Sequence, residues 1–321
     1  MLGSFKRLTV VVLVLGLAPL LVNKVAAQGL RITLLGTGTP APRPDRFGPA
    51  TLVEAGAKKL LFDAGRGASI RMWQLGIPLS ELDAVFVTHF HHDHISGLAD
   101  LWLTGWLPPQ FGQRSHALRV IGPTGTKQVT QGLLDAYALD IDIRVADEGL
   151  PRAGAAFDVM EFSSSSLVYD QDDVRVTAFT VNHGEFIKPA FGYRVDFADR
   201  SVLISGDTKF DENVIEAGSG VDVVIHEVVL ADERLFEKYP ALIAVRDHHT
   251  TPEEAGIVFR EIRPKLAVYT HLVNLSAPDI PELRLGDLVE QTRRTYSGPL
   301  VVGHDLMTIE VAENVVVGDR R

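Results

Sequence analysis

The sequence contains no cysteine among its 321 residues. Disulfide bonds, thiolate metal sites and a cysteine nucleophile are therefore excluded, and any metal ion must be held by histidine and carboxylate side chains. Basic residues are also scarce, because 31 Lys and Arg face 41 Asp and Glu, for a formal net charge of −10. Proteins that grip the phosphate backbone usually carry an excess of positive charge, so this balance argues against a nucleic-acid partner.

Long apolar runs are lacking except for one near the N-terminus. Two basic residues precede the apolar run 8–22, and the small residues Ala26 and Ala27 follow it. This order is typical of a secretory signal peptide, so residues 1–27 are predicted to be removed on export. The run is interrupted by Pro19 and is shorter than the roughly 17–25 residues that span a bilayer. We therefore predict an exported protein, periplasmic or secreted, with no stable membrane span after removal of the signal.

The rest of the chain has the composition of a folded globular protein, with 46% hydrophobic and 22% charged residues. Short runs rich in Val, Ile, Leu and Phe alternate with longer amphipathic stretches, which is an α/β pattern. No linker divides the chain, so residues 28–321 are predicted to form a single domain. Each half offers a sheet and outer helices, which predicts a four-layered αββα architecture with two mixed β-sheets between helices.

The strongest chemical signal is the segment T-H-F-H-H-D-H at residues 88–94. It follows an apolar strand, so His89 and His91 lie on the same side of an extended chain, and Asp93 and His94 follow in a tighter turn. Imidazole and carboxylate suit zinc and related divalent ions, and two adjoining clusters of such groups predict a two-metal site. A polar helix cap with chance histidines is the alternative.

This segment and several shorter motifs together resemble the metallo-β-lactamase superfamily, and within it the branch that contains ribonuclease Z and the arylsulfatases of that fold. The resemblance covers nearly all of the chain after the predicted signal peptide. The further motifs are L-G-T-G-T-P at 35–40, L-F-D-A-G at 61–65, N-H-G at 182–184, S-G-D-T at 205–208, H-E at 226–227, H-T-T-P-E-E-A at 249–255 and Y-T-H at 269–271.

The resemblance implies a set of metal ligands in two groups. The ligands are His89, His91 and His183 for one ion, Asp93, His94 and His271 for the other, and Asp207 as the bridge between them. It implies two Zn²⁺ ions, with iron or manganese as alternatives, and gives Asp93 a catalytic role as well as that of a ligand. His183 or His271, taken alone, could equally be a buried structural histidine.

Other residues are expected to support the metal site. Asp63 would orient ligating imidazoles through hydrogen bonds, although a plain turn aspartate is the alternative. His249 resembles the general-acid histidine of ribonuclease Z and would protonate the leaving oxygen, with the adjacent His248 as the alternative donor. His226 and Glu227 would orient His249 or the ligands, unless they are simply polar residues at a strand end. No substrate-binding residue is indicated.

Two tryptophans follow the histidine motif on a predicted helix. Trp102 and Trp106 are four residues apart, so their side chains share one helix face. They either line a pocket for an aromatic leaving group or pack in the core.

The predicted reaction is ester hydrolysis by a hydroxide that bridges two metal ions. Ribonuclease Z carries a long basic arm between the ligands that correspond to His183 and Asp207, but only 23 residues separate them here. From the missing arm, the predicted export and the acidic charge, we predict an exported hydrolase of a small anionic ester, either an aryl sulfate or a phosphate diester, with no nucleic-acid partner. The alternatives are a ribonuclease Z-type tRNA 3′-processing endoribonuclease and a non-hydrolytic metal-binding or iron-oxygenase protein. Oligomeric state is left open, with a homodimer as one option.

Overall fold

The computed structural model describes residues 29–319 of the chain. The predicted signal peptide, residues 1–27, lies outside the described residues. Among those described, no helix is both long enough and apolar enough to cross a membrane.

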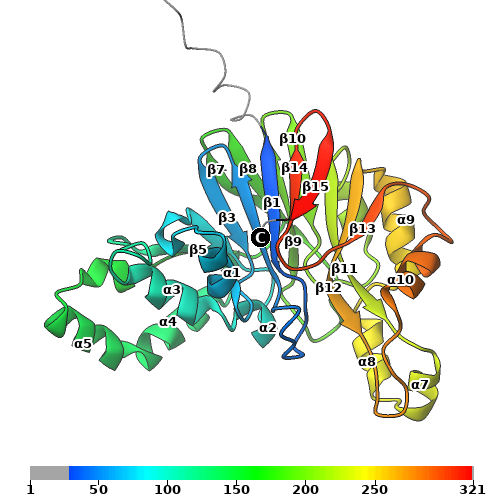
Figure 1. The fold of residues 1–321 in the computed structure, drawn as a ribbon, viewed down its shortest axis with the longest axis horizontal. Coiled ribbons are helices and arrows are strands. Elements are labelled where there is room, and N and C mark those ends of the chain that lie inside the picture. The colour runs from blue at the N-terminus through cyan, green and yellow to red at the C-terminus, as the bar shows by residue number, and fades with distance from the viewer. Residues whose placement is uncertain (1–28, 320–321) are drawn as a thin grey trace, which may run out of the picture.

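The first β-sheet has eight strands in the order β15-β14-β1-β2-β3-β4-β5-β6 (Figure 1). In that order the strands span Val315–Asp319, Met307–Val311, Leu30–Gly36, Ala50–Ala55, Lys58–Phe62, Ala84–Phe86, Leu118–Pro123 and Phe157–Phe162. Neighbours from β15 to β3 are antiparallel, and those from β3 to β6 are parallel.

The second sheet has seven strands in the order β13-β12-β11-β10-β9-β8-β7. Their bounds are Leu300–Val302, Leu266–Asn274, Val223–Leu230, Arg200–Ile204, Phe191–Phe197, Val174–Thr180 and Ser166–Gln171. The strands from β13 to β10 are parallel, and those from β10 to β7 are antiparallel. Both sheets are therefore mixed, as the sequence predicts.

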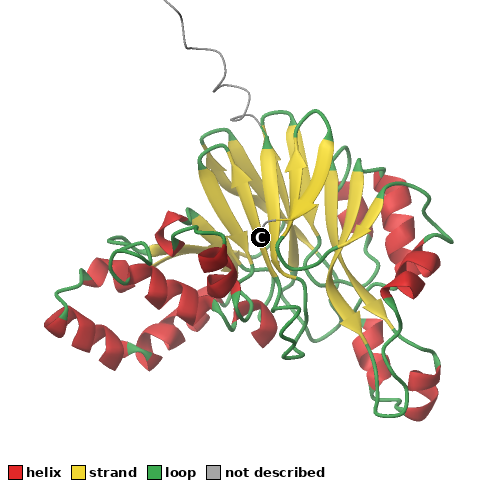
Figure 2. Ribbon diagram, in the orientation of Figure 1, coloured by secondary structure: helices red, strands yellow, loops and turns green. Residues whose placement is uncertain are grey.

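Helices lie on both sides of the pair of sheets (Figure 2). Those on the side of the first sheet are α1 (Ala68–Gln74), α2 (His92–Ile95), α3 (Leu98–Trp106), α4 (Thr126–Ala136) and α5 (Ala138–Asp147). Those on the other side are α6 (Glu212–Ala217), α7 (Arg234–Lys238), α8 (Leu242–Asp247), α9 (Pro252–Ile262) and α10 (Leu285–Thr292), and short 3₁₀ turns occur at Leu79–Glu81 and Arg152–Ala155. Two mixed sheets with helices outside them confirm the predicted α/β fold.

The centre of the molecule is an apolar layer between the two sheets. Phe62 and Phe86 stack there with ring centroids 4.7 Å apart, and Tyr193 of β9 packs against both. The buried Tyr193 hydroxyl donates a 2.6 Å hydrogen bond to the carbonyl oxygen of Val87, directly before the histidine motif. This contact fixes the second sheet against the segment that carries the first histidines.

The two tryptophans of α3 belong to the core. Both Trp102 and Trp106 are 0% exposed. The Trp102 ring stacks on Phe157 at 4.4 Å, and the Trp106 indole nitrogen donates to the carbonyl oxygen of Pro151 at 2.9 Å. Of the two options left by the sequence, the structure therefore selects core packing rather than a leaving-group pocket.

Replacing Trp102 by Ala is expected to lower the free energy of unfolding by about 3–5 kcal/mol, because a fully buried ring leaves a cavity. The matched control is Trp73→Ala, since Trp73 is 56% exposed and loses mainly its ring contact with Phe111, worth about 1 kcal/mol. Urea denaturation of both variants measures the difference. Equal losses would contradict the core assignment.

Candidate metal centre

The predicted ligands arrive from both sheets at one edge of the molecule. His89 and His91 follow β4, His183 follows β8 and Asp207 follows β10. The histidine motif belongs to the first sheet, and the later ligands follow or lie within strands of the second. The packing of the two sheets against each other thus brings the later ligands to the histidine motif.

His271 lies inside β12 rather than at its end. The pairing of β11 with β12 shifts register between His226 and Val228, and His271 has a φ of +42°. A bulge of this kind re-aims a side chain. The strand β12 therefore pairs with its neighbours in the sheet and, at the bulge, turns the His271 imidazole towards the site.

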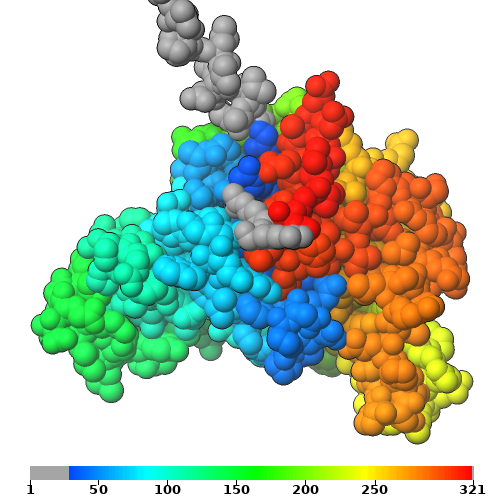
Figure 3. Space-filling model, in the orientation of Figure 1, coloured from blue at the N-terminus to red at the C-terminus, as the bar shows by residue number. Residues whose placement is uncertain are grey.

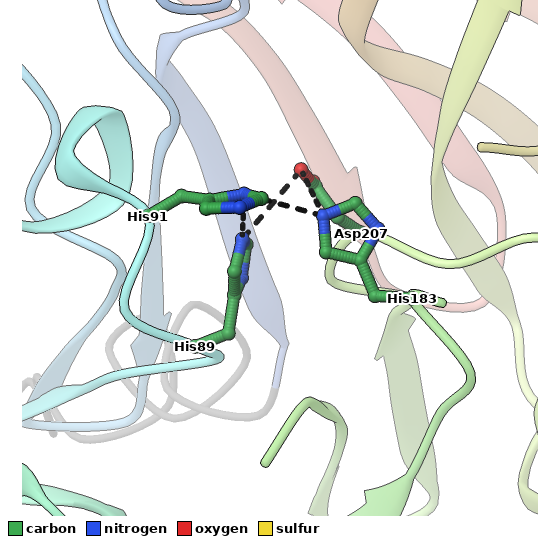
Figure 4. A group of neighbouring side chains, drawn as sticks. All are labelled: His89, His91, His183 and Asp207. Carbon is green, nitrogen blue, oxygen red and sulfur yellow. Dashed lines mark hydrogen bonds and ion pairs between the residues drawn. The ribbon is translucent and has the colours of Figure 1, made fainter. Parts of the chain in front are cut away.

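The first group of side chains comprises His89, His91, His183 and Asp207 (Figure 4). The Nε2 atom of His89 lies 3.0 Å from Nδ1 of His91, and the Nε2 atom of His183 lies 3.3 Å from the same Nδ1. The Oδ2 atom of Asp207 is 3.8 Å from His89 Nε2 and 3.7 Å from His183 Nε2. The candidate ligand atoms of this group all lie within 4.8 Å of one another.

The second group comprises Asp93, His94 and His271. The Nε2 atom of His271 lies 3.3 Å from Oδ2 of Asp93 and 3.3 Å from Oδ2 of Asp207. The Nε2 atom of His94 lies 3.2 Å from the same Asp207 oxygen. Asp207 therefore contacts both groups, which is the position that the resemblance gives to a bridging carboxylate.

The direction of the ring nitrogens shows that a cation fits here. In the neutral ring of His183, Nδ1–H donates to the carbonyl oxygen of His248 at 2.8 Å, so the lone pair of Nε2 faces the cluster. Asp63 accepts from His94 Nδ1 at 2.7 Å, which leaves His94 Nε2 facing Asp207. The buried Oδ1 of Asp93 has no hydrogen-bond partner in the structure. Lone pairs and carboxylates that face one another repel unless a cation or a proton lies between them.

Burial and charge divide the histidines into two kinds. Burial lowers the pKa of His183 to about 3 and lowers the pKa of His89 well below its ordinary value. Both rings are thus neutral, which is the form that binds metal. Burial also acts to lower the pKa of His94, but the charges of Asp207 and Asp63 raise it well above its ordinary value. An incoming cation would displace that proton.

Asp63 supports the site through several hydrogen bonds. Its side chain is buried and accepts from the backbone nitrogen of Thr88 at 2.9 Å and from the Thr88 hydroxyl. The Oδ2 atom, which accepts from the Thr88 hydroxyl, also accepts from His94 Nδ1 at 2.7 Å. These contacts hold the start of the histidine motif and one imidazole in a single arrangement.

We expect Asp63→Asn to weaken metal binding by about 10–100-fold, because the carboxylate that orients and charges His94 is lost. Competition with a chromogenic chelator measures the affinity. Asp170→Asn, at an exposed carboxylate of β7, is the matched control and should leave the affinity unchanged. An unaltered affinity in Asp63→Asn would show that Asp63 is only a turn residue.

His249 lies beside the second group and is held by Glu227. Its Nδ1 lies 3.0 Å from Oε2 of Glu227, whose other oxygen accepts from the backbone nitrogens of Thr250 and Thr208. Burial acts to lower the pKa of His249, but the charge of Glu227 and its hydrogen bond raise it. The local sequence helps to fix the backbone that carries His249. Thr251 and Glu254 form a capping box that starts α9 directly after this segment.

His248 is the weaker candidate for the proton donor. Its ring lies 5.0 Å from the rings of His183 and His249, and burial lowers its pKa. No carboxylate within residues 29–319 hydrogen-bonds to the His248 ring. The structure therefore favours His249 of the two donors that the sequence leaves open.

The structure does not bring His226 into the site. Its ring packs on Phe259 of α9, and its Nδ1 donates to the carbonyl oxygen of Glu227 at 2.7 Å. Successive side chains of a strand point to opposite faces of the sheet, so only Glu227 of the pair reaches His249. The predicted orienting role of His226 has no supporting contact here.

The fold and these convergent side chains define a metallo-β-lactamase-type hydrolase. Comparison with known proteins identifies its family and its branch of the superfamily. The family described as Anti-Pycsar protein Apyc1 matches residues 30–249. Ribonuclease Z of Mycobacterium bovis (strain BCG / Pasteur 1173P2) is 33% identical over 282 residues, which is 88% of this chain and 98% of that protein. Ribonuclease Z of Mycobacterium marinum is 32% identical over 284 residues, covering 88% of this chain and 99% of that protein. The chain therefore belongs to the Apyc1 family, in the ribonuclease Z branch of the metallo-β-lactamase superfamily.

Solved structures share the fold. The metallo-β-lactamase fold protein YhfI from Bacillus subtilis superposes with a TM-score of 0.68 at 18% identity, covering 88% of this chain and 99% of that chain. The short form of human tRNase Z gives a TM-score of 0.65 at 22% identity, with 88% and 99% covered.

These relatives contradict the prediction of an aryl sulfate hydrolase and fit the ribonuclease Z alternative better. Proteins named ribonuclease Z align with this chain over nearly their whole length, so the chain is a metal-dependent hydrolase of phosphoester bonds. Between His183 and Asp207 the structure has a loop, β9 and β10 and no long arm. Relatives named ribonuclease Z nevertheless align with this chain over nearly their whole length, so the missing arm was not a valid argument against a ribonuclease.

Relatives named for a ribonuclease activity also oppose the expectation of no nucleic-acid partner. That expectation was drawn in part from the net charge of the whole chain, which does not report the charge of the site. Bound cations are the largest local charges in such a site, and they decide which anions enter it whatever the charge of the whole surface.

Proposed function

We propose that the protein is a ribonuclease Z-type endoribonuclease that hydrolyses an RNA phosphodiester with two Zn²⁺ ions in its metal centre. The observation that carries this proposal is the His249–Glu227 pair beside the two ligand groups, in a chain 33% identical to ribonuclease Z. His89, His91, His183 and Asp207 would hold one ion. Asp93, His94 and His271 would hold the other and share Asp207.

The chain's own residues would position the phosphodiester and supply the proton that the leaving oxygen needs. Bound divalent ions supply Lewis acidity and an activated water. The water oxygen would bond to phosphorus as the bond from phosphorus to the leaving ribose oxygen breaks, and the proton that the water loses would pass to solvent, from which the His249 ring is later reprotonated. His249 then gives its Nε2 proton to that oxygen, while Glu227 holds Nδ1–H and stabilises the protonated ring.

A small phosphodiester is a second candidate, and the observation that favours it is the signal-like pattern of residues 1–27. The predicted signal peptide bears on this choice. Export would separate the enzyme from tRNA precursors. We propose export after removal of residues 1–27, and N-terminal sequencing of the protein recovered from the cell envelope would test it. An intact N-terminus favours an intracellular RNA, and cleavage near Ala27 favours a small substrate.

The test is a cleavage assay with the zinc-loaded protein on a precursor tRNA that carries a 3′ trailer. Bis(p-nitrophenyl) phosphate and a nucleoside 3′,5′-cyclic phosphate are assayed alongside, with p-nitrophenyl sulfate as the negative control. Release of the trailer by the wild type, lost on treatment with a chelator and restored by Zn²⁺, supports the proposal. Hydrolysis of the small diesters with an intact precursor would replace it by the second candidate.

A further inference from the structure

The loop that follows His183 projects an aromatic side chain into solvent. We call residues 184–189 the rim loop. His183 is buried at its start, and the backbone nitrogen of Val181 donates to the carbonyl oxygen of Ala190 at 3.1 Å, which closes its base. The rim loop is therefore a short excursion anchored directly at the metal centre.

The base of the rim loop is also tied to the other ligands. The carbonyl oxygen of Asn182 accepts from the backbone nitrogen of Lys209 at 3.0 Å, two residues after Asp207. The Asn182 side chain in turn accepts from the backbone nitrogen of Gly184 at 3.1 Å, where φ is +110°. This geometry fixes the direction in which the loop leaves the site.

Phe186 lies at the tip of this loop and is 91% exposed, more than any other large hydrophobic residue of the described chain. Three Cα–Cα steps separate it from His183, so the two Cα atoms are at most about 11 Å apart. An exposed phenylalanine forgoes the stabilisation that burial would provide. Its ring is thus open to contact by a molecule that extends out of the metal centre.

The charges of the rim loop do not select an anion. Glu185 and Lys188 flank the aromatic residue, and both are exposed. Within residues 29–319 neither forms an ion pair or a side-chain hydrogen bond, and their charges cancel. The feature that the loop offers to a ligand is therefore the face of the ring.

We propose that Phe186 stacks on a nucleobase of the substrate while the adjoining phosphodiester occupies the metal centre. The proposal rests on the proposed phosphodiesterase function and adds a specificity residue to it. Every nucleobase has a flat π face, so stacking on an aromatic ring recognises a base with little regard to its identity. The enzyme would thereby prefer nucleotide esters to other phosphodiesters.

Two substrates with one leaving group isolate this contact. Thymidine 5′-(p-nitrophenyl phosphate) carries a base, and methyl p-nitrophenyl phosphate does not. The quantity measured is the ratio of their kcat/KM values. For Phe186→Ala this ratio should fall about tenfold, mainly through KM for the thymidine ester. Phe186→Tyr and Phe186→Trp retain a ring and should keep the wild-type ratio.

The matched control is Leu139→Ala, because Leu139 is 78% exposed and belongs to α5, whose part of the chain forms the green lobe at the left of Figure 3. It should leave the ratio unchanged. A wild-type enzyme that hydrolyses neither ester and also leaves the precursor tRNA intact would refute the proposed function itself. Hydrolysis of both with an unchanged ratio in Phe186→Ala would overturn only the stacking proposal. So would an equal loss on both esters with an altered sedimentation coefficient, since the ring would then belong to a protein interface.

Discussion

Replacement of Asp207 by Asn is expected to reduce phosphodiester hydrolysis by about a thousandfold or more and to remove most of the bound metal. Its Oδ2 atom lies 3.2 Å from His94 Nε2, 3.3 Å from His271 Nε2 and 3.7–3.8 Å from the first group. An amide keeps the shape of this side chain but removes its negative charge. Two neighbouring cations would then repel each other without the anion between them.

Elemental analysis and kcat on bis(p-nitrophenyl) phosphate measure the two losses together. Asp135→Asn, at an exposed carboxylate of α4, is the control and should retain both metal and rate. His89→Ala should behave like the Asp207 variant, whereas His116→Ala, at an exposed histidine, should not. Full metal content and full rate in Asp207→Asn would rule out the proposed centre.

Replacement of His249 by Ala is expected to have the next largest effect, and its size should depend on the leaving group. A poor leaving group such as a ribose oxygen needs a proton, so its hydrolysis should slow by about 10²–10⁴-fold. p-Nitrophenolate leaves without one, so its release should change far less. A plot of log kcat/KM against the pKa of the leaving group should become steeper in the variant.

Glu227→Gln tests the origin of that proton. The substitution keeps a hydrogen-bond acceptor near His249 Nδ1 but removes the charge that raises the pKa of the ring. The variant should therefore lose part of the rate on poor leaving groups and bind metal normally. A His249→Ala variant that slowed all esters equally would move the acid role to His248, whose replacement should then show the steeper plot.

The active-site assignments came from the sequence to different degrees. His89, His91, Asp93 and His94 lie within one short segment, so their proximity is a local property that spacing alone reveals. His183, Asp207 and His271 were placed only by resemblance, because nothing in their own surroundings distinguishes a ligand from a buried polar residue. The structure shows that they meet, through the packing of the two sheets and the bulge at His271.

Substrate preference was the main failure of sequence reasoning. The missing arm and the acidic net charge are properties of the chain as a whole, whereas the choice of ester depends on a few groups around the centre. Phe186 was not singled out because a lone aromatic residue in a loop carries no periodic pattern. Only its exposure in the structure, together with its short distance along the chain from His183, identifies Phe186 as a candidate substrate contact.

The sequence by itself determined the α/β class, the reliance on histidine and carboxylate ligands, and the core of the metal centre. These follow from composition and from neighbours along the chain. Only the tertiary structure decided that Glu227 rather than His226 supports His249, that Trp102 and Trp106 are core residues, and that Phe186 stands beside the site. Each of these depends on which face of an element meets another element, and that is settled by packing between residues far apart in the chain.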